Sequence, residues 1–398
     1  MIGHRFEHDV VISGVGQSPI GRRLGRSDLD LTIESTLSAM ADAGLERADI
    51  DGLSTYPGGY GPPSRGYGGP SAYDMQDALR LDLNWFQGAA ELPGQLGALV
   101  AAAMAVSAGL ARHVLVYRTV TESTAQGHQS RSAVFDSSGV ASGIGRWITP
   151  YGAPSAVNWL ALVAARHFYE HGTTREQLAQ IALTARANAA LNPAAVYRHP
   201  LTMDDYLSSR MISTPFCLYD CDVPVDGSTA IIVSHVDYAR DLPGPPVYLD
   251  AIGTAARGRL SWDQYDDLSS MAAQGAAEHL WSRTTLKPAD VDMIQLYDGF
   301  SMLALVWLEA LGFCRPGEGG AFIEGGHRIA RDGELPLNTF GGQLSAGRLH
   351  GFGHLHEAIV QLRGGSGERQ VADARVAAVG NGGGPIAGCA LLTAEPVS

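Results

Sequence analysis

The chain has 398 residues, of which 45% are hydrophobic, and this length favours two or more cores because one core rarely extends beyond roughly 250–300 residues. Its formal net charge of -13 argues against nucleic acid or an anionic membrane as a partner, since phosphate binding requires clustered Lys and Arg. The sequence has no apolar run of about 18 residues and no basic-then-apolar amino terminus, which predicts a cytoplasmic protein without a membrane segment.

The first predicted unit begins with a buried strand at 9–16 (DVVISGVG) and an amphipathic helix at 28–43. The segment 45–56 (LERADIDGLSTY) follows this helix. An Ala-rich helix at 96–108 then leads into the apolar segment 111–118 (ARHVLVYR), which we predict to be a strand. Strands that alternate with helices in this way are typical of an α/β protein.

The second half of the chain repeats this unit. A helix at 266–283 precedes the segment 286–297 (LKPADVDMIQLY), which aligns with 45–56 without a gap. Tyr297 therefore corresponds to Tyr56. We expect Tyr56 to be structural or to lie at a subunit interface.

A second repeated pattern lies near the carboxyl end. There a helix near 354–363 leads into the apolar segment 374–381 (ARVAAVGN), as the helix at 96–108 leads into 111–118. Residues from about 120 to 220 have no counterpart in the second half, and we predict an inserted loop domain there. The segment 221–233 (CDVPVDGSTAIIV) is expected to return to the first half as a strand. Two copies of one α/β unit account for this pattern.

These elements predict an α/β fold made of two duplicated halves. The N-terminal half is expected to cover residues 1–245, with the loop domain of about 120–220 inserted in it, and the C-terminal half to cover 246–398. Because the strands are continuous apolar runs between helices, we expect mostly parallel sheets that are covered on both faces.

Four glycine-marked segments end strands or open helices, at 90–97, 297–301, 341–351 and 380–388. The last of them resembles a dinucleotide-binding fingerprint only superficially, because it lacks a helix entered through G-x-G-x-x-G and an acidic residue about 20 positions later. A metal site is not expected at His350, His354 and His356. Two of these histidines, at i and i+2, point to different sides of a helix, and no carboxylate has suitable spacing.

The duplicated halves and the inserted loop domain resemble the thiolase superfamily, and four segments match its active-site loops in order. The family's nucleophile helix corresponds to residues 92–109. Its Asn-Glu-Ala-Phe loop, which is His-Asp-Cys-Phe in the lipid-transfer branch, corresponds to 297–300 (YDGF). Its Gly-His-Pro and Cys-x-Gly-Gly-Gly loops correspond to 347–349 (GRL) and 380–384 (GNGGG). The resemblance implies a layered αβαβα fold that binds acyl-CoA.

Three departures from the family pattern change the expected chemistry. Leu92 occupies the position of the nucleophilic cysteine, Arg348 that of the histidine and Gly380 that of the second cysteine. Leu and Gly cannot form a thioester or carry a proton, so the family's covalent route is not expected. Through its Tyr-Asp-x-Phe and Gly-Gly-Gln-Leu-Ser loops, the chain instead resembles the lipid-transfer-protein-like (sterol carrier protein-type) aldolases that shorten steroid side chains.

The resemblance implies a retro-aldol cleavage in which tyrosines from two loops act as acid and base. Tyr297 matches the first tyrosine and is predicted to shuttle the proton, whereas the second falls at Arg348. We expect Arg348 to polarise Tyr297 or the thioester oxygen. His350 is the predicted second acid/base group, and Asp298 is expected to orient one of these side chains. The alternatives are a core tyrosine, a structural ion pair at Arg348 and an Asp298 that only holds a turn.

Five residues are assigned to substrate binding: Gly382, Gly383, Gly384, Ser345 and Ser228. The backbone N–H groups of the three glycines are expected to complete an oxyanion site, because glycine permits close approach. For the CoA nucleotide the sequence offers basic residues that are either a local patch or ordinary solvated charges: Arg186, Arg198 and Arg210.

We therefore expect a carbon–carbon lyase that cleaves a bulky β-hydroxyacyl-CoA, such as one with a steroid-like side chain, into a ketone or aldehyde and a short acyl-CoA. Two alternatives stay open: a catalytically degenerate thiolase-like protein that binds acyl-CoA or lipid, and a non-covalent acyltransferase. No cofactor is expected besides the CoA of the substrate. The resemblance also implies a homodimer and a heterocomplex with a small OB-fold protein that carries a zinc ribbon.

Overall fold

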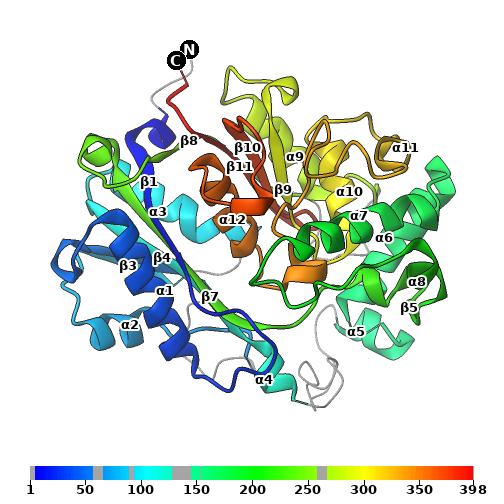
Figure 1. The fold of residues 1–398 in the computed structure, drawn as a ribbon, viewed down its shortest axis with the longest axis horizontal. Coiled ribbons are helices and arrows are strands. Elements are labelled where there is room, and N and C mark those ends of the chain that lie inside the picture. The colour runs from blue at the N-terminus through cyan, green and yellow to red at the C-terminus, as the bar shows by residue number, and fades with distance from the viewer. Residues whose placement is uncertain are drawn as a thin grey trace.

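One continuous sheet organises the molecule. The computed structural model describes residues 5–56, 66–88, 94–127, 145–153, 155–257 and 267–397. Within these residues, nine strands form a sheet in the order β3-β2-β4-β7-β1-β8-β11-β10-β9 (Figure 1). Their bounds are β1 Val10–Gln17, β2 Gly52–Thr55, β3 Trp85–Gly88, β4 His113–Thr121, β7 Asp226–His235, β8 Val247–Ala256, β9 Met293–Leu296, β10 Val376–Gly382 and β11 Ile386–Thr393.

The strand order repeats between the two halves. In the first half β1, β7, β4 and β2 lie side by side, and in the second half β8, β11, β10 and β9 follow in the corresponding order. The halves join where β1 pairs antiparallel with β8. β2 ends immediately before Tyr56 and β9 immediately before Tyr297, so the two tyrosines follow equivalent strands. The predicted duplication of one α/β unit is confirmed.

The expectation of mostly parallel sheets is wrong. β2 pairs in parallel with β3 and β4, and β9 pairs in parallel with β10, but β7 and β11 pair antiparallel with both of their neighbours. β11 follows β10 through a short turn, which reverses the chain and imposes antiparallel pairing. A continuous apolar run shows that both faces of a strand are buried, but it does not reveal the direction of its neighbours.

The helices pack in layers on the two halves of the sheet. α1 covers the outer face of the first half, α3 and α12 lie between the halves, and α9 covers the outer face of the second half with α10 beside it (Figure 1). Their bounds are α1 Asp28–Ala43, α2 Ala72–Leu79, α3 Gly97–Ser107, α9 Met271–Trp281, α10 Ser301–Ala310, α11 Gly319–Ile323 and α12 Phe352–Leu362. None of the helices in the described residues is long and apolar enough to cross a membrane. The layered αβαβα fold is confirmed.

Local sequence explains where these helices begin and end. The Ser27 hydroxyl accepts a hydrogen bond from the Asp30 N–H at the start of α1, and Gly44 ends this helix with a φ of 67°. α12 begins after Gly351, which has a φ of 89°. A Cβ at Gly351 would lie 2.5 Å from Asn381 Oδ1, so only glycine fits there. This glycine fixes the position of the residue before it, His350.

The central core combines side chains of both halves. Its buried residues include Tyr56 and Leu99 of the first half and Phe352 and Leu355 of the second half. The rings of Tyr56 and Phe352 are 6.1 Å apart between centroids. Because α12 packs in this shared core, the residues that precede it lie between the two halves.

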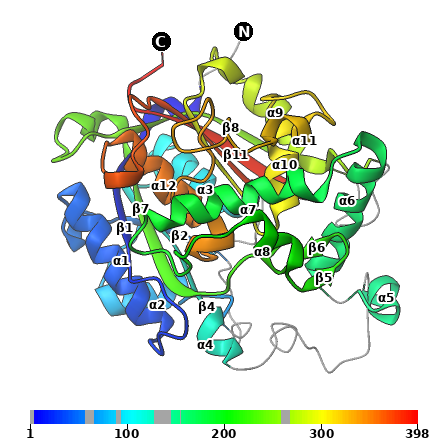
Figure 2. The same ribbon diagram turned by 45° about the vertical axis from the view of Figure 1, so that its right-hand side comes forward.

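The inserted segment is mainly helical. Its described elements are α4 Glu122–Gln126, α5 Gly145–Ile148, α6 Ala156–His171, α7 Arg175–Ala190, α8 Met203–Ser208, β5 Met211–Ser213 and β6 Phe216–Cys217. α7 packs against α10 and against the π-helical turn Gly342–Ala346, and Figure 2 shows α6, α7 and α8 gathered beside α10. The insertion therefore contacts the loop that leads to Arg348 and His350. The predicted boundary at residues 245 and 246 lies just before β8 and stays a prediction.

Candidate active site

The Tyr-Asp-Gly-Phe corner after β9 is shaped by contacts of each of its residues. The Tyr297 N–H donates to the Gly380 carbonyl at 2.8 Å, which ties the corner to β10. A Cβ at Gly299 would lie 2.6 Å from Cε1 of the Tyr297 ring, so the ring covers residue 299 only because that residue is glycine. Phe300 stacks on Phe216 with 5.7 Å between ring centroids. The corner thus fixes the Tyr297 ring at the end of β9.

Asp298 holds the neighbouring loop in place. Its Oδ1 accepts hydrogen bonds from the Gln343 N–H at 2.8 Å and from His354 Nε2 at 3.0 Å. Its Oδ2 accepts from the Leu344 N–H at 3.4 Å. The structure therefore pairs Asp298 with the π-helical turn and with α12, and not with the residues that it was expected to orient.

His350 lies between two tyrosines of the first half of the chain. The Tyr56 hydroxyl is 2.6 Å from its Nδ1, and the Tyr67 hydroxyl is 3.0 Å from its Nε2. The Tyr297 ring lies 6.1 Å from the imidazole between centroids. His350 has a φ of 50°, a conformation that non-glycine residues seldom adopt and that costs conformational energy. Tyr56, expected to be structural or at an interface, is thus a direct neighbour of a predicted catalytic residue.

Arg348 is a buried cation that is paired with carboxylates. Its Nη1 forms an ion pair with Glu122, and its Nε lies 2.8 Å from Asp222 Oδ2. Burial alone would lower the pKa of Arg348, but Glu122, Tyr297 and Asp222 raise it well above its ordinary value. Its guanidinium carbon lies 5.6 Å from the centre of the Tyr67 ring. Arg348 is therefore a permanent cation beside two tyrosines, and its ion pairs agree with the structural alternative.

Arg118 of β4 is a second buried cation, which the sequence analysis missed. Only 1% of its surface is exposed, and its guanidinium carbon lies 4.9 Å from the centre of the Tyr56 ring and 5.0 Å from that of Tyr67. Its Nη2 is 3.5 Å from His350 Nδ1, and its Nε has no hydrogen-bond partner among the described residues. The available signal was the arginine that ends the segment ARHVLVYR, directly after the apolar residues VLVY.

We call one group of side chains the tyrosine cluster: Tyr56, Tyr67, Arg118, Tyr297, Arg348 and His350. It contains three of the four predicted catalytic residues, which come from the second half of the chain. The first half supplies the other members. All four cysteines are free thiols, and none of them is a member of this cluster. The position of Leu92 lies outside the described residues.

The predicted oxyanion glycines lie where β10 turns into β11: Gly382 is the last residue of β10, and Gly383 and Gly384 belong to the turn. The Gly383 N–H donates to the Ile386 carbonyl at 3.2 Å, which leaves it unavailable to a substrate oxygen. The Gly382 carbonyl accepts a hydrogen bond from Trp307 Nε1 at 3.2 Å, and the Gly384 carbonyl accepts one from the Ala272 N–H. These contacts place the turn against α10 and the start of α9.

The two predicted serines lie in structural networks. The Ser345 hydroxyl accepts a hydrogen bond from Arg186 Nε at 2.9 Å, which joins the π-helical turn to α7. Ser228 on β7 is within 2.8 Å of the Ser35 hydroxyl and accepts from the Thr119 hydroxyl at 2.7 Å. The structure does not bring Ser228 to the tyrosine cluster, because successive residues of a strand face opposite sides of the sheet and this network lies on the α1 side.

The three arginines considered for the CoA nucleotide differ in their surroundings. Arg186 is buried, and its guanidinium carbon lies 5.5 Å from the centre of the Tyr197 ring and 5.7 Å from that of Tyr219. Burial lowers its pKa. Arg198 and Arg210 are exposed. No nucleotide site follows from these positions alone.

Trp307 fills the space that a cysteine at position 380 would need. A Cβ added to Gly380 would lie 2.8 Å from Cδ2 of the Trp307 ring. Trp307 is fully buried and held by its hydrogen bond to Gly382, so the ring cannot easily move. The loss of the second cysteine and the packing of α10 are therefore coupled.

We predict that Gly380→Cys lowers the free energy of unfolding by about 1–3 kcal/mol, because overpacking of a filled core costs that much. Chemical denaturation measures this change. Gly244→Ala is the control, since nothing lies within 4 Å of a Cβ at that position. Equal stability of the two variants would contradict the role of Trp307.

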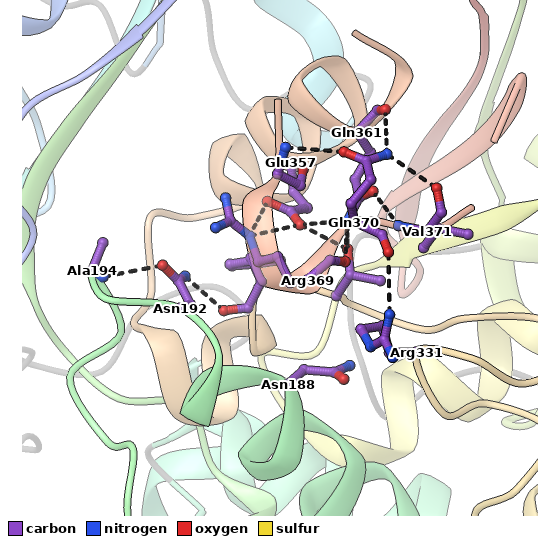
Figure 3. Close-up of polar contacts among 12 residues, drawn as sticks. Asn188, Asn192, Ala194, Arg331, Glu357, Gln361, Arg369, Gln370 and Val371 are labelled. Carbon is purple, nitrogen blue, oxygen red and sulfur yellow. Dashed lines mark hydrogen bonds and ion pairs between the residues drawn. The ribbon is translucent and has the colours of Figure 1, made fainter. Parts of the chain in front are cut away.

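A cavity of about 200 Å³ lies beside the loop that carries Arg348 and His350, but neither of these two residues lines it. Gly347 and Leu349 face this cavity, together with Asn192 and Arg369. Figure 3 shows that three of its polar residues, Asn192, Glu357 and Arg369, form hydrogen bonds or ion pairs within the protein. Arg369 Nε lies 3.0 Å from both carboxylate oxygens of Glu357, and Asn192 Nδ2 donates to the Phe340 carbonyl at 2.8 Å.

The remaining titratable group at this cavity is His356. Burial, followed by the charge of Arg369, lowers the pKa of His356 to about 4, so it stays neutral at physiological pH. Among the residues that the structure describes, no group of three or more His, Cys, Asp or Glu side chains is placed to hold a metal ion. We interpret the residues around this cavity as structural support for the loop that carries Arg348 and His350.

Known proteins are similar to this chain over most of its length. The family model for the thiolase C-terminal domain-like domain matches residues 254–392. The steroid side-chain-cleaving aldolase of Thermomonospora curvata is 34% identical over 370 residues, which cover 89% of this chain and 90% of that protein. The 17-hydroxy-3-oxo-4-pregnene-20-carboxyl-CoA lyase of Mycobacterium tuberculosis is 35% identical over 378 residues, covering 89% of this chain and 92% of the lyase.

A solved structure agrees with these relatives. The Ltp2-ChsH2(DUF35) aldolase superposes with a TM-score of 0.86 at 32% sequence identity, and the match covers 98% of this chain and 99% of that one. Identity above 30% over nearly the whole length, with the same layered fold, leaves no doubt about common ancestry. The chain belongs to the thiolase superfamily, in the branch that contains the steroid side-chain-cleaving aldolases.

Proposed function

We propose that this chain is a retro-aldol carbon–carbon lyase that acts on a bulky β-hydroxyacyl-CoA. The observation that carries the proposal is the tyrosine cluster, in which Tyr297 of the second half meets His350 and two tyrosines of the first half. This cluster has groups that move protons and cations that stabilise negative charge, and no thiol belongs to it. Those are the requirements of a cleavage without a covalent intermediate.

The chemistry needs two proton transfers and one stabilised anion. A base removes the proton of the β-hydroxyl group, the bond between the α- and β-carbons breaks, and its electron pair forms the thioester enolate. An acid then protonates the α-carbon, which releases a short acyl-CoA. Tyr297 is the base in this proposal, because Arg348 lies close enough to interact with its charge and favours the phenolate. No cofactor other than the CoA of the substrate takes part.

Two buried amides are better placed than the glycine turn to stabilise the enolate oxygen. Asn381 follows Gly380 on β10, and neither polar atom of its side chain has a hydrogen-bond partner among the described residues. Gln343 accepts from the Gly351 N–H at 3.3 Å, while its own Nε2 donates to no atom of the described chain. Buried donors without an acceptor are costly, and a substrate oxygen would satisfy them.

The relatives suggest the substrate class and the partner. The lyase of M. tuberculosis is named for 17-hydroxy-3-oxo-4-pregnene-20-carboxyl-CoA, and the similar solved aldolase is named for Ltp2 together with ChsH2(DUF35). This chain would accordingly act on a steroid-like β-hydroxyacyl-CoA, in a heterocomplex with a small OB-fold partner that carries a zinc ribbon. We further propose a homodimer, and retain the cytoplasm as the expected compartment.

The test is turnover of a defined substrate by the chain alone and by the chain co-expressed with such a partner. In 17-hydroxy-3-oxo-4-pregnene-20-carboxyl-CoA the hydroxyl carbon is β to the thioester carbonyl, so cleavage releases propionyl-CoA and a 17-ketone. Both products, in equal amounts, are expected by liquid chromatography with mass spectrometry. Tight binding of this compound without turnover in either preparation would instead favour a degenerate acyl-CoA-binding protein. Formation of a longer acyl chain would favour the acyltransferase.

A further inference from the structure

The proposed cleavage leaves the enolate without an identified proton donor, and the first half of the chain offers one. Two tyrosine hydroxyls contact the His350 ring: that of Tyr56 lies 2.6 Å from Nδ1, and that of Tyr67 lies 3.0 Å from Nε2 and 3.4 Å from Nδ1. Tyr56 and His350 are buried, whereas Tyr67 is only partly buried in the turn that precedes α2. Of these three groups, Tyr67 is therefore the least buried.

The Tyr67 hydroxyl lies 3.0 Å from Nε2 and 3.4 Å from Nδ1, so it sits beside the imidazole and not in line with an Nε2–H bond. The contacts favour the neutral form with the proton on Nδ1. In this form Nδ1–H donates to the Tyr56 oxygen, and the Tyr56 hydroxyl donates to the His350 carbonyl, 3.0 Å away. The unprotonated Nε2 then faces the Tyr67 hydroxyl and helps to orient it.

The charges around Tyr67 favour the loss of its proton. Arg118 and Arg348 both face its ring, at 5.0 Å and 5.6 Å from the centroid. Arg348 is balanced by Glu122 and Asp222, but the described contacts of Arg118 are with rings, with His350 and with a backbone carbonyl. A buried guanidinium with no carboxylate partner in the described part of the chain stabilises a phenolate strongly, and it disfavours a charged imidazolium at His350.

We propose that Tyr67 donates the proton to the α-carbon of the thioester enolate, with His350, Tyr56 and Arg118 as positioning residues. This inference rests on the proposed function. Tyr297 takes the hydroxyl proton, the pair of electrons from the broken bond passes through the enolate into the new C–H bond, and Tyr67 supplies the proton for that bond. One proton is taken and one is given, so no further reactant is needed. A proton then passes from Tyr297 to Tyr67 and restores the starting state.

The two proton transfers can be measured separately. By microscopic reversibility, the acid that protonates the enolate also removes the α-proton of the short acyl-CoA product. Propionyl-CoA incubated with the protein in D₂O, with the partner present if turnover requires it, therefore takes up deuterium at its α-carbon, and mass spectrometry follows this exchange. No ketone is added, so the β-hydroxyl transfer of Tyr297 does not enter the measurement.

The variants are expected to separate the roles of the two tyrosines. Tyr67→Phe lowers both exchange and cleavage by at least about 100-fold, because each loses the acid/base group. Tyr297→Phe loses cleavage but retains exchange. Arg118→Met lowers exchange with little change in the KM for propionyl-CoA, since the guanidinium stabilises the phenolate and not the bound thioester. Tyr117→Phe is the control, because Tyr117 lies next to Arg118 on β4 but its hydroxyl donates to the Pro70 carbonyl.

Each outcome supports or overturns a defined statement. Exchange that persists in Tyr67→Phe, in a wild-type protein that cleaves the β-hydroxyacyl-CoA, overturns the role of Tyr67 and leaves the lyase intact. A wild-type protein that neither cleaves nor exchanges overturns both proposals. Loss of exchange in Tyr297→Phe but not in Tyr67→Phe assigns both proton transfers to Tyr297 and overturns the inference.

Discussion

Tyr297→Phe is expected to lower kcat for carbon–carbon cleavage by about 10²–10⁴-fold, the usual contribution of a positioned acid or base. The substitution removes only the hydroxyl group, and the ring still packs over Gly299 at the end of β9. We therefore expect KM to change little and the folded state to persist. Initial rates of propionyl-CoA release from the 17-hydroxy steroid thioester measure both constants.

A matched control separates the catalytic effect of the Tyr297 hydroxyl from the general effect of removing a tyrosine hydroxyl. Tyr169 is 84% exposed on α6, so Tyr169→Phe should retain the wild-type rate. Undiminished turnover in Tyr297→Phe would remove Tyr297 from the mechanism, whatever the outcome for the other tyrosines.

Arg348→Met is expected to lower the free energy of unfolding by about 3–5 kcal/mol, because it leaves two buried carboxylates without their cation. Glu122 and Asp222 are both buried, and each pairs with Arg348. Urea denaturation of the purified variant measures the loss. Arg375→Met is the comparison, because Arg375 pairs with Glu395 where both side chains are exposed, and such pairs contribute little.

A triple variant distinguishes the charge effect from the loss of packing. Arg348→Met combined with Glu122→Gln and Asp222→Asn removes the uncompensated charges, and most of the lost stability should return. Activity should stay low in the triple variant, because the cation beside Tyr67 and Tyr297 is still missing. A single variant as stable as the wild type would show that the ion pairs are not needed for folding.

The sequence predicted those features that depend on local pattern. The ungapped alignment of 45–56 with 286–297 predicted that Tyr56 and Tyr297 would end equivalent strands, and β2 and β9 confirm it. The helix predicted at 28–43 has those bounds. Such features follow from apolar periodicity and from helix caps, and both depend only on residues that are close together in the sequence.

Features that depend on distant contacts were missed. Tyr56 and Tyr67 are 294 and 283 positions away from His350, and no spacing rule connects residues so far apart. The sequence also did not reveal that Ser228 lies on the α1 side of the sheet, since the face to which it points depends on the register between β4 and β7. A resemblance to a family locates loops, whereas charges such as Arg118 emerge only when two halves meet.

The ion pairs of Arg348 have a mechanical consequence. Glu122 lies where the chain enters the inserted domain, and Asp222 lies where the chain leaves it. The Arg348 guanidinium, from the second half, forms ion pairs with both carboxylates. The insertion can therefore move relative to the core only if these ion pairs break, or if the loop that carries Arg348 and His350 moves with it. A protein that binds to the insertion would thereby displace Arg348 and His350 through these ion pairs. The rate of catalysis could in this way depend on whether the complex is assembled.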